Sequence, residues 1–381
     1  MRKTVLLFQR VMVPYREAIF KKLNKVVNII ICFGKKGSSH AFHPEVNPSV
    51  PYYRIDSLYP IPKKESLVIQ DVVTPLIKFK PDIVVVEFSI LIISNWIIFI
   101  LKPFLKYKLI LWTQGYNRKT GFNPKRYFSD KLRVWWMNRA NAVILYSQKA
   151  REIISPYIKN QQKIFVAQNS LDTKKLIQKN KDFEKIGKDN IKKRIGFTKG
   201  YNLIYLGRLV KEKEPDRAID VFRIVSEKLG SVTLHIVGDG PLSAELKKQA
   251  KGLNIIFWGG ISDDERLSEL FFAADIMVMP GYLGLAVVYA FCFGVPVVSQ
   301  KKGNRGPFHS PEVEYVLDGK TGFFVDYGDN GKMADVICGY LIRSDLNKTM
   351  KKNMDYIIKN RCSTDKMFEG FRKALGYLGR N

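Results

Sequence analysis

Hydrophobic residues in this chain alternate between two patterns. Short runs rich in Val, Ile and Leu predict strands buried on both faces, and segments with apolar residues every three or four positions predict amphipathic helices. In the first half we predict strands at 4–8, 26–33, 82–87, 108–113, 142–146 and 163–167, and helices at 15–25, 66–79, 90–105, 128–138 and 147–158. Regular alternation of this kind predicts βαβ units and a parallel sheet.

The second half repeats the alternation from 202 to 326, after a charged stretch with a predicted helix at 182–194. Three further helices are predicted at 331–342, 346–360 and 364–378. Because 381 residues exceed the size at which one hydrophobic core stops growing, we expect an α/β protein with two Rossmann-like domains. The long connections 34–50 and 114–127 exceed usual loop lengths and are expected to face substrate.

One apolar stretch, 83–101, is long enough to be considered as a membrane span. We favour a strand followed by a separate helix, because Glu87 interrupts the run and Pro81 opens it. The helix 90–105 carries Trp96, Phe99 and Phe104 beside lysines, a combination that suits contact with a bilayer surface.

The formal net charge of +28 is distributed unevenly. Residues 1–165 hold 28 Lys and Arg against 9 Asp and Glu, a net charge of +19, and the remainder carries +9. A Lys-rich source composition explains the abundance of lysine but not this asymmetry. A basic N-terminal half is typical of proteins that bind polyanions: nucleic acid, anionic lipid or a diphosphate-bearing substrate. Nucleic acid is not expected, because the interleaved aromatic and basic motifs of the usual modules are missing.

Four scattered cysteines and four histidines give no reason to expect disulfides or a metal site built from these residues. An Asp-x-Asp pair at a strand end is also missing. We therefore expect neither a metal nor a cofactor.

The most informative segment is 279–298, which reads as a strand end, a glycine-rich turn, an apolar helix and a Val-rich strand. Its turn contains Pro280, Gly281, Tyr282, Gly284 and Leu285. Glycines allow close approach of a ligand to the backbone, and the unpaired amides of a helix start favour phosphate.

A second segment supports this interpretation. The predicted strand 202–206 is followed by Gly207, Arg208 and, five residues after the arginine, Lys213. These cations follow the carboxyl end of a strand, where ligands bind in open α/β sheets.

The chain resembles the family-4 glycosyltransferases of the GT-B fold. The matching motifs run in order through most of 200–330: Gly207-Arg208-Leu209 with Lys213, His235 to Pro241 with Gly238, Trp258-Gly259, Ala274 to Pro280, Gly284 to Val298, and Glu314 to Gly322. The N-terminal half matches loosely, by its pattern and by Val13 to Arg16. The resemblance implies an acceptor-binding domain at 1–170, a nucleotide-sugar-binding domain at 171–362, and a last helix at 363–381 that returns to the first domain.

The resemblance also implies roles for individual residues. Arg208 and Lys213 would hold the donor diphosphate and its glycosidic oxygen, as preorganised cations that stabilise the departing charge. The donor site would further include Gly207, Gly238, Pro280, Gly281, Tyr282, Gly284, Leu285, Tyr289 and Glu314, and the acceptor site Tyr15, Arg16, Gln114, Asn117 and Arg118. Glu312 and His309 are each as compatible with a structural role as with a role in the site, and Arg305 is a further candidate anion contact.

The chain departs from the family pattern at three positions. The family places two glutamates where this chain has Gly281 and Tyr289, and a histidine where it has Gln114. One interpretation is a divergent enzyme with a different donor, such as a dTDP-linked or 6-deoxy sugar. Another is a degenerate protein that only binds nucleotide sugar, and a third is a sugar-nucleotide epimerase.

The function that we predict is transfer of a hexosyl or deoxyhexosyl group from a nucleotide-diphosphate sugar to a glycan acceptor of a bacterial surface polysaccharide. The resemblance implies a retaining, metal-independent reaction. The basic N-terminal half suits a lipid-linked acceptor and an anionic membrane surface, which predicts a cytoplasmic enzyme peripheral to the inner face of the cell membrane.

Overall fold

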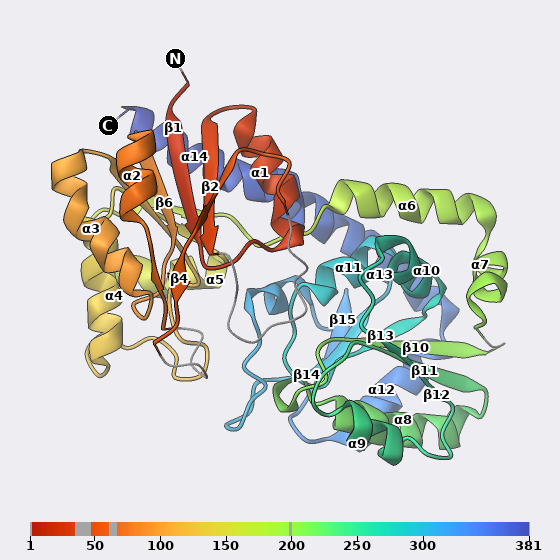
Figure 1. Cartoon of the computed structure of the whole chain (residues 1–381). Helices are drawn as coiled ribbons and strands as arrows, with labels where there is room; N and C mark the ends of the chain where they lie inside the picture. The colour runs from red at the N-terminus through yellow and green to blue at the C-terminus, as the bar shows by residue number, and fades with distance from the viewer. Residues whose placement is uncertain (1, 35–46, 61–66, 198–199, 381) are drawn as a thin grey trace. The chain divides into compact units, whose positions relative to one another are not determined.

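A computed structural model describes residues 2–34, 47–60, 67–197 and 200–380. It divides into two compact units, Met1–Ser170 with Thr364–Asn381 (unit 1) and Leu171–Ser363 (unit 2) (Figure 1). Most of the connection 34–50, which was predicted to face substrate, lies outside the described residues.

Unit 1 is built on a seven-stranded sheet of order β3-β2-β1-β6-β7-β8-β9, in which every pairing is parallel. The strands are β1 (Thr4–Gln9), β2 (Asn28–Gly34), β3 (Tyr52–Ile55), β6 (Ile83–Glu87), β7 (Lys108–Thr113), β8 (Ala142–Leu145) and β9 (Ile164–Val166). Both faces are covered by helices, which explains why the strands read as continuous apolar runs rather than alternating ones.

The helices of unit 1 lie on opposite faces of the sheet (Figure 1). On one face lie α1 (Glu17–Asn24) and α14 (Thr364–Arg380), and on the other α2 (Val73–Phe79), α3 (Ile93–Leu105), α4 (Phe128–Arg139) and α5 (Gln148–Ile154). The C-terminal helix α14 buries Phe371 against Trp112 of β7, with ring centroids 5.0 Å apart. The last helix therefore completes the core that the first 170 residues begin.

Unit 2 has a six-stranded parallel sheet of order β12-β11-β10-β13-β14-β15. Its strands are β10 (Tyr201–Leu206), β11 (Val232–Val237), β12 (Ile255–Gly259), β13 (Ile276–Val278), β14 (Val297–Gln300) and β15 (Gly322–Val325). Its helices are α6 (Thr173–Ile186), α7 (Lys188–Ile195), α8 (Pro215–Leu229), α9 (Ser243–Gln249), α10 (Asp264–Ala273), α11 (Ala286–Cys292), α12 (Asn330–Leu341) and α13 (Ser344–Ile357). The strand order reverses between β10 and β13, because the chain adds β11 and β12 on one side of β10 and β13, β14 and β15 on the other. Folds of this kind bind ligands at such a switch point.

The α/β class and the two parallel sheets confirm the predicted fold, whereas two predicted helices are wrong in their bounds and one strand was missed. The helix predicted at 66–79 begins only at Val73, because Ile69–Gln70 form strand β5, paired antiparallel with β4 (Ser57–Leu58). The helix predicted at 182–194 is two helices, since Gly187 ends α6 with a φ of +89°. Strand β3 was not predicted, because its residues are partly exposed at the edge of the sheet.

The apolar stretch 83–101 forms β6 and most of α3, as predicted. Within the described parts of the chain, every helix falls short of the length and apolar character that crossing a bilayer requires.

Candidate functional site

Glycines bring the loops at the carboxyl ends of β10 and β11 into contact in unit 2. A Cβ atom on Gly238, whose φ is +140°, would lie 1.9 Å from the carbonyl oxygen of Gly207. One on Gly240 would lie 2.6 Å from the carbonyl oxygen of Leu209. These contacts exclude any larger residue at both positions. Packing between loops therefore explains Gly238 without a ligand, and its predicted donor contact stays a prediction.

Lys213 lies at the centre of the predicted donor residues. It ends the short 3₁₀-helix Lys211–Lys213, and its Nζ donates a hydrogen bond of 2.7 Å to the carbonyl oxygen of Tyr282. The same Nζ lies 4.5 Å from the centre of the Tyr282 ring, and a Cβ on Gly284 would lie 3.7 Å from it. The structure thus brings Lys213 together with Tyr282 and Gly284, which lie far from it in the sequence.

The charge of Lys213 is sensitive to this environment. Burial lowers the pKa of Lys213 to about 8, although Glu312 opposes that shift. The ammonium group is consequently protonated at neutral pH but loses its proton far more readily than a surface lysine. Arg208, by contrast, is exposed on the loop that follows β10.

The glycine-rich turn after β13 is held from beneath by His309 and Ser310. The backbone N–H of Leu283 donates to His309 Nδ1 at 3.1 Å, so the imidazole proton lies on Nε2, which donates to the carbonyl oxygen of Gln300 at 2.8 Å. The Ser310 hydroxyl donates to the Leu283 carbonyl oxygen at 2.8 Å. His309 therefore has a structural role that fixes the turn.

The two glutamates of the following 3₁₀-helix, Pro311–Tyr315, differ in position. Glu312 is buried and is a second acceptor within reach of the single Ser310 hydroxyl proton, beside the Leu283 carbonyl oxygen, whereas Glu314 is half-buried. Of the two carboxylates, that of Glu312 acts on Lys213, since its charge raises the pKa of the lysine. The sequence motif alone singled out Glu314 instead.

Tyr289 lies on α11 with 6% of its surface exposed. Its hydroxyl is 2.8 Å from Ser268 Oγ and donates to the carbonyl oxygen of Asp264 at 3.3 Å, both on or beside α10. A donor contact by Tyr289 requires the hydroxyl to give up these partners. Its assignment to the donor site stays a prediction, and its packing role is evident.

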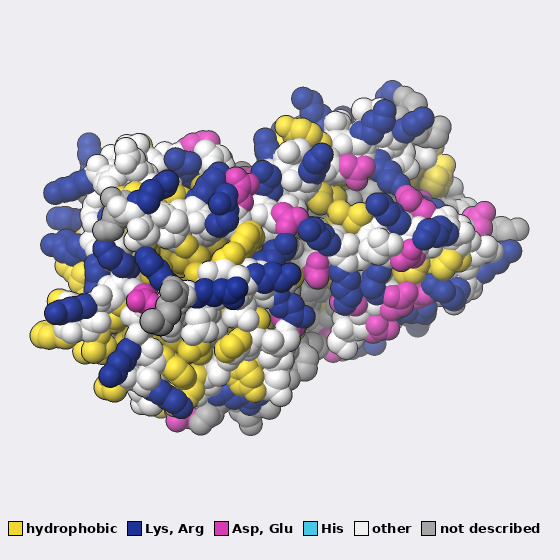
Figure 2. Space-filling model, turned by 90° about the horizontal axis from the view of Figure 1, so that it is seen from above, with side chains coloured by type: hydrophobic (Ala, Val, Ile, Leu, Met, Phe, Trp, Pro, Cys, Tyr) yellow, Lys and Arg dark blue, Asp and Glu magenta, His cyan; other side chains and the backbone are white. Residues whose placement is uncertain are grey.

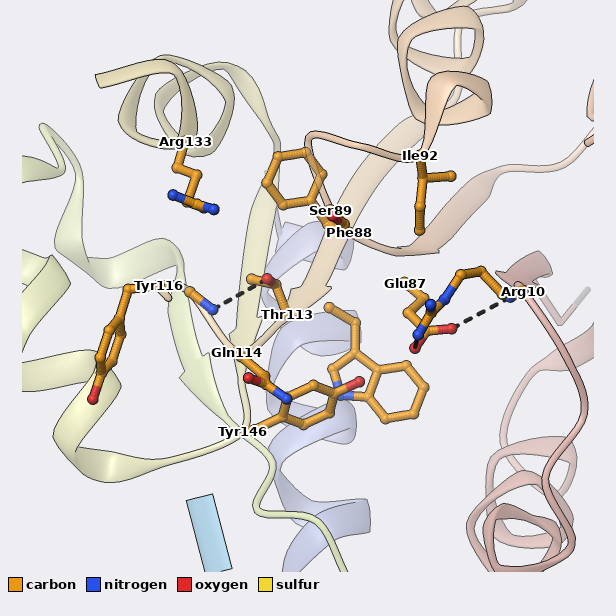
Figure 3. A pocket seen from close by; sticks show the side chains of 12 residues that line it. Arg10, Glu87, Phe88, Ser89, Ile92, Thr113, Gln114, Tyr116, Arg133 and Tyr146 are labelled. Atoms are coloured by element: carbon orange, nitrogen blue, oxygen red, sulfur yellow. Dashed lines mark hydrogen bonds and ion pairs between the residues drawn. The ribbon is translucent and has the colours of Figure 1, made fainter. Parts of the chain in front are cut away.

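Unit 1 contains a cavity of about 290 Å³ at the carboxyl ends of its central strands (Figure 3). It is lined by Arg10, Glu87, Phe88, Ser89, Ile92, Trp112, Thr113, Gln114, Gly115, Tyr116, Arg133 and Tyr146. These residues lie at or just after the carboxyl ends of β1, β6, β7 and β8, in the segment before α3, or on α4. Strands far apart in the sequence thus build one polar hollow at the edge where α/β sheets bind ligands.

Of the residues predicted to bind the acceptor, Gln114 lines this cavity. Arg16 is buried just behind it, and Tyr15 lies beside Arg16, whose guanidinium carbon is 5.8 Å from the Tyr15 ring centre. Asn117 and Arg118 do not line the cavity. Asn117 turns back on its own loop, accepting from the Lys119 N–H at 2.8 Å, and Arg118 donates to Ser147 at 3.4 Å.

A cluster of charged side chains forms one wall of the cavity, and the sequence analysis did not predict it. Glu87 ends β6, and its carboxylate lies 3.7 Å from the Arg10 guanidinium and 3.9 Å from that of Arg16. Arg16 also donates to the Tyr146 hydroxyl at 3.2 Å and lies 4.4 Å from the centre of the Trp112 ring. The available signal was a carboxylate at the carboxyl end of an apolar strand, which we interpreted only as a break in the run.

This cluster keeps Glu87 ionised. Burial by itself would raise the pKa of Glu87, but the guanidinium groups of Arg16 and Arg10 lower it below its ordinary value. The carboxylate is consequently an acceptor of hydrogen bonds at neutral pH. Among the described residues no cluster of three or more His, Cys, Asp and Glu side chains is placed to hold a metal ion.

Unit 1 also exposes large apolar side chains between cations. Ile100 and Phe104 of α3 are 60% and 75% exposed, and Phe128 at the start of α4 is 77% exposed. Along the chain, Lys102 lies between Ile100 and Phe104, and Lys106 follows Phe104. Figure 2 shows dark blue Lys and Arg side chains spread between yellow apolar ones over the face of unit 1 in view.

Comparison with known proteins shows which family and which fold this chain resembles. Residues 187–356 match the family model described as glycosyl transferases group 1. The sulfoquinovosyl transferase SQD2 of Arabidopsis thaliana is 35% identical over 130 residues, which are 33% of this chain and 24% of that protein. A GDP-mannose-dependent α-(1-6)-phosphatidylinositol dimannoside mannosyltransferase of Mycobacterium tuberculosis is 38% identical over 99 residues, covering 25% of this chain and 26% of the relative. The chain thus spans about a quarter of the length of these curated relatives.

Solved structures match over almost the whole chain. HepE of Anabaena in complex with UDP and glucose has a TM-score of 0.70 at 17% identity, covering 98% of this chain and 99% of the other. WaaG, described as a glycosyltransferase involved in lipopolysaccharide biosynthesis, has a TM-score of 0.63 at 14% identity, covering 96% and 98%. At these identities the likeness shows the fold, which is that of the GT-B glycosyltransferases.

Proposed function

We propose that this chain, whose residues 187–356 match the model of the glycosyl transferases group 1 family and whose two units have the GT-B fold, is a glycosyltransferase that uses a nucleotide-diphosphate sugar. The observation that carries the proposal is the position of Lys213. It is a half-buried cation at the switch point of the unit 2 sheet, directly beside the glycine-rich turn. A departing diphosphate needs positive charge that is already in place, and Lys213 with Arg208 supplies it.

We further propose that the reaction is metal-independent and retaining, with a hexosyl or deoxyhexosyl donor. Relatives support the nucleotide-sugar donor, since one is described as GDP-mannose-dependent and HepE was solved with UDP-glucose. No cofactor beyond the sugar nucleotide enters the proposal. The absence of a carboxylate at position 281 has a local cause, because the Glu212–Lys213 backbone fills that space.

The acceptor is proposed to be a glycan, bound through the cavity of unit 1. A lipid-linked glycan fits the exposed Ile100, Phe104 and Phe128 with their neighbouring lysines, because apolar side chains among cations favour an anionic bilayer surface. We therefore propose that the enzyme is a peripheral protein at the cytoplasmic side of a membrane and acts in surface-glycan synthesis. WaaB and WaaG, described as acting on or being involved in lipopolysaccharide, share the fold.

The first experiment is a thermal-shift panel of UDP, GDP, dTDP and their common sugars. We expect one nucleotide class to raise the Tm, and Arg208→Ala to abolish that rise. Arg223→Ala, an equally exposed arginine on α8, is the matched control and should keep it. A chain that shows no shift with any nucleotide would contradict the proposal.

A second assay separates the remaining alternatives. A transferase releases free nucleoside diphosphate in proportion to glycosylated acceptor, whereas an epimerase interconverts nucleotide sugars without an acceptor. A degenerate binding protein gives the thermal shift and neither product.

A further inference from the structure

The cavity of unit 1 differs from an ordinary polar cleft because a carboxylate is fixed in its wall with acceptor capacity to spare. We infer that this cavity binds a neutral, hydroxyl-bearing sugar ring and that Glu87 is the residue that selects it, by accepting hydrogen bonds from the ring hydroxyls. The identification of that ring as part of the acceptor rests on the proposed function, while its binding in the cavity does not.

Glu87 is available to a ligand. Its side chain is 20% exposed, and it lines the cavity beside Arg10 (Figure 3). The backbone N–H of Arg10 donates to Oε2 at 3.3 Å, whereas the guanidinium groups of Arg10 and Arg16 lie 3.7 and 3.9 Å from Oε1. An ionised carboxylate accepts about four hydrogen bonds, so Glu87 retains room for two adjacent hydroxyls.

Arg10 and Arg16 stabilise the ionised carboxylate of Glu87 and leave it accessible to a ligand in the cavity. Arg16 uses its guanidinium on the Tyr146 hydroxyl and on the face of Trp112, so it is oriented by the protein interior. Arg10 approaches from the end of β1. Both stabilise the ionised carboxylate, which makes its hydrogen bonds to neutral hydroxyls stronger than those of an amide.

The other walls match the two faces of a sugar ring. Ser89 and Gln114 offer hydroxyl and amide groups to the cavity. Phe88 and Ile92 supply apolar surface for the C–H groups of the ring.

A neutral ring is favoured over a phosphate. The carboxylate of Glu87 would repel an anion in the same space. Arg133, which reaches the cavity from α4 on the side away from Glu87 in Figure 3, is already paired with the buried Asp130. Each of the three guanidinium groups around the cavity is thus paired with a carboxylate, although Arg10 and Arg16 share that of Glu87, so one net positive charge remains.

The test is Glu87→Gln, which keeps the shape and one acceptor oxygen but removes the charge. In the full chain, saturation-transfer NMR with methyl α- and β-hexopyranosides should show binding of at least one ring, and E87Q should weaken it about tenfold, as loss of a charge-assisted hydrogen bond predicts. Glu17→Gln is the matched control, since Glu17 also accepts a backbone N–H, from Ser49 at 3.1 Å, and pairs with Lys21 away from the cavity.

Catalysis gives an independent measurement. E87Q should raise the acceptor KM about tenfold. The donor KM should stay within about twofold of that of the unaltered chain, and the nucleotide-induced rise in Tm within about one degree. If E87Q proves unstable, Gln114→Ala replaces it, with the same split expected between acceptor and donor KM. Inorganic phosphate is the competing probe and should not displace the pyranoside.

Two results would overturn the inference: pyranoside binding that E87Q and Q114A leave unchanged, or phosphate binding in the cavity in preference to every pyranoside. Failure of the proposed function looks different. In that case nucleotides give no thermal shift, while pyranosides still bind and still depend on Glu87.

Discussion

The backbone of Lys213 passes so close to Gly281 that a Cβ atom on the glycine would lie 2.3 Å from the Lys213 carbonyl carbon. The Tyr282 N–H donates to the Glu212 carbonyl oxygen at 2.9 Å, which ties the two loops together beside that contact. Because backbone atoms cannot move aside as a flexible side chain does, position 281 admits no side chain at all. The missing carboxylate is thus linked to the position of the lysine loop.

Gly281→Ala is expected to destabilise the protein by about 1–3 kcal/mol, the usual cost of forcing an extra group into a filled space. Chemical denaturation followed by far-UV circular dichroism measures it. Gly339→Ala on α12 is the control, since a Cβ there meets nothing within 4 Å and alanine favours a helix. Equal stability of both variants would show that the loop 211–213 can move away.

The alkaline limb of the pH profile should report Lys213. Its pKa is lowered to about 8, so kcat/KM should fall about tenfold per pH unit above that value if the protonated amine binds the diphosphate. Lys213→Ala should remove the limb and cost about 2–4 kcal/mol of barrier. A profile that is flat to pH 9.5 would exclude this role.

The same shift has the opposite sign for stability. Between about pH 8 and the ordinary lysine value of 10.5, the unfolded chain keeps a proton that the folded chain has released. The contribution of Lys213 to the free energy of unfolding therefore rises with pH across this window. Comparing the pH dependence of unfolding for the unaltered chain and Lys213→Met isolates that contribution.

Tyr289→Phe tests whether the tyrosine packs or binds the donor. Since the hydroxyl is paired with Ser268 and with the Asp264 carbonyl oxygen, we expect a loss of about 1 kcal/mol of stability and nucleotide affinity within twofold. Titration calorimetry with UDP and dTDP measures the affinities. A change in the ratio of the two would instead support a contact with the ribose and the alternative of a deoxyribose donor.

Phe104→Ser should weaken binding to vesicles that contain anionic phosphatidylglycerol, because it removes the most exposed apolar side chain of α3. Cosedimentation at two salt concentrations measures it, and vesicles of phosphatidylcholine alone should bind little. Tyr356→Ser, a comparably exposed aromatic on α13 of unit 2, is the control. Equal binding by both variants would contradict the assignment of this surface.

The apolar runs and their spacing were enough to determine the fold class. Strands such as 83–87 and 108–113 are buried on both faces, so they stand out as continuous Val, Ile and Leu, and the following helices follow from their period. Strand β3 and the short hairpin β4–β5 escaped this reasoning, because half-exposed edges carry no such pattern. The motifs around Lys213 and Gly284 also identified the candidate donor residues before any geometry was known.

Only the tertiary structure decided what surrounds those residues. That Glu87, Arg10 and Trp112 line one cavity depends on β1, β6 and β7 lying side by side, although their ends are dozens of residues apart in the chain. The close pass at Gly281 and the pairing of the Tyr289 hydroxyl are likewise contacts between distant segments. Sequence periodicity records whether a residue is buried, but the partner that it meets there is set by how the strands are ordered and how the loops cross.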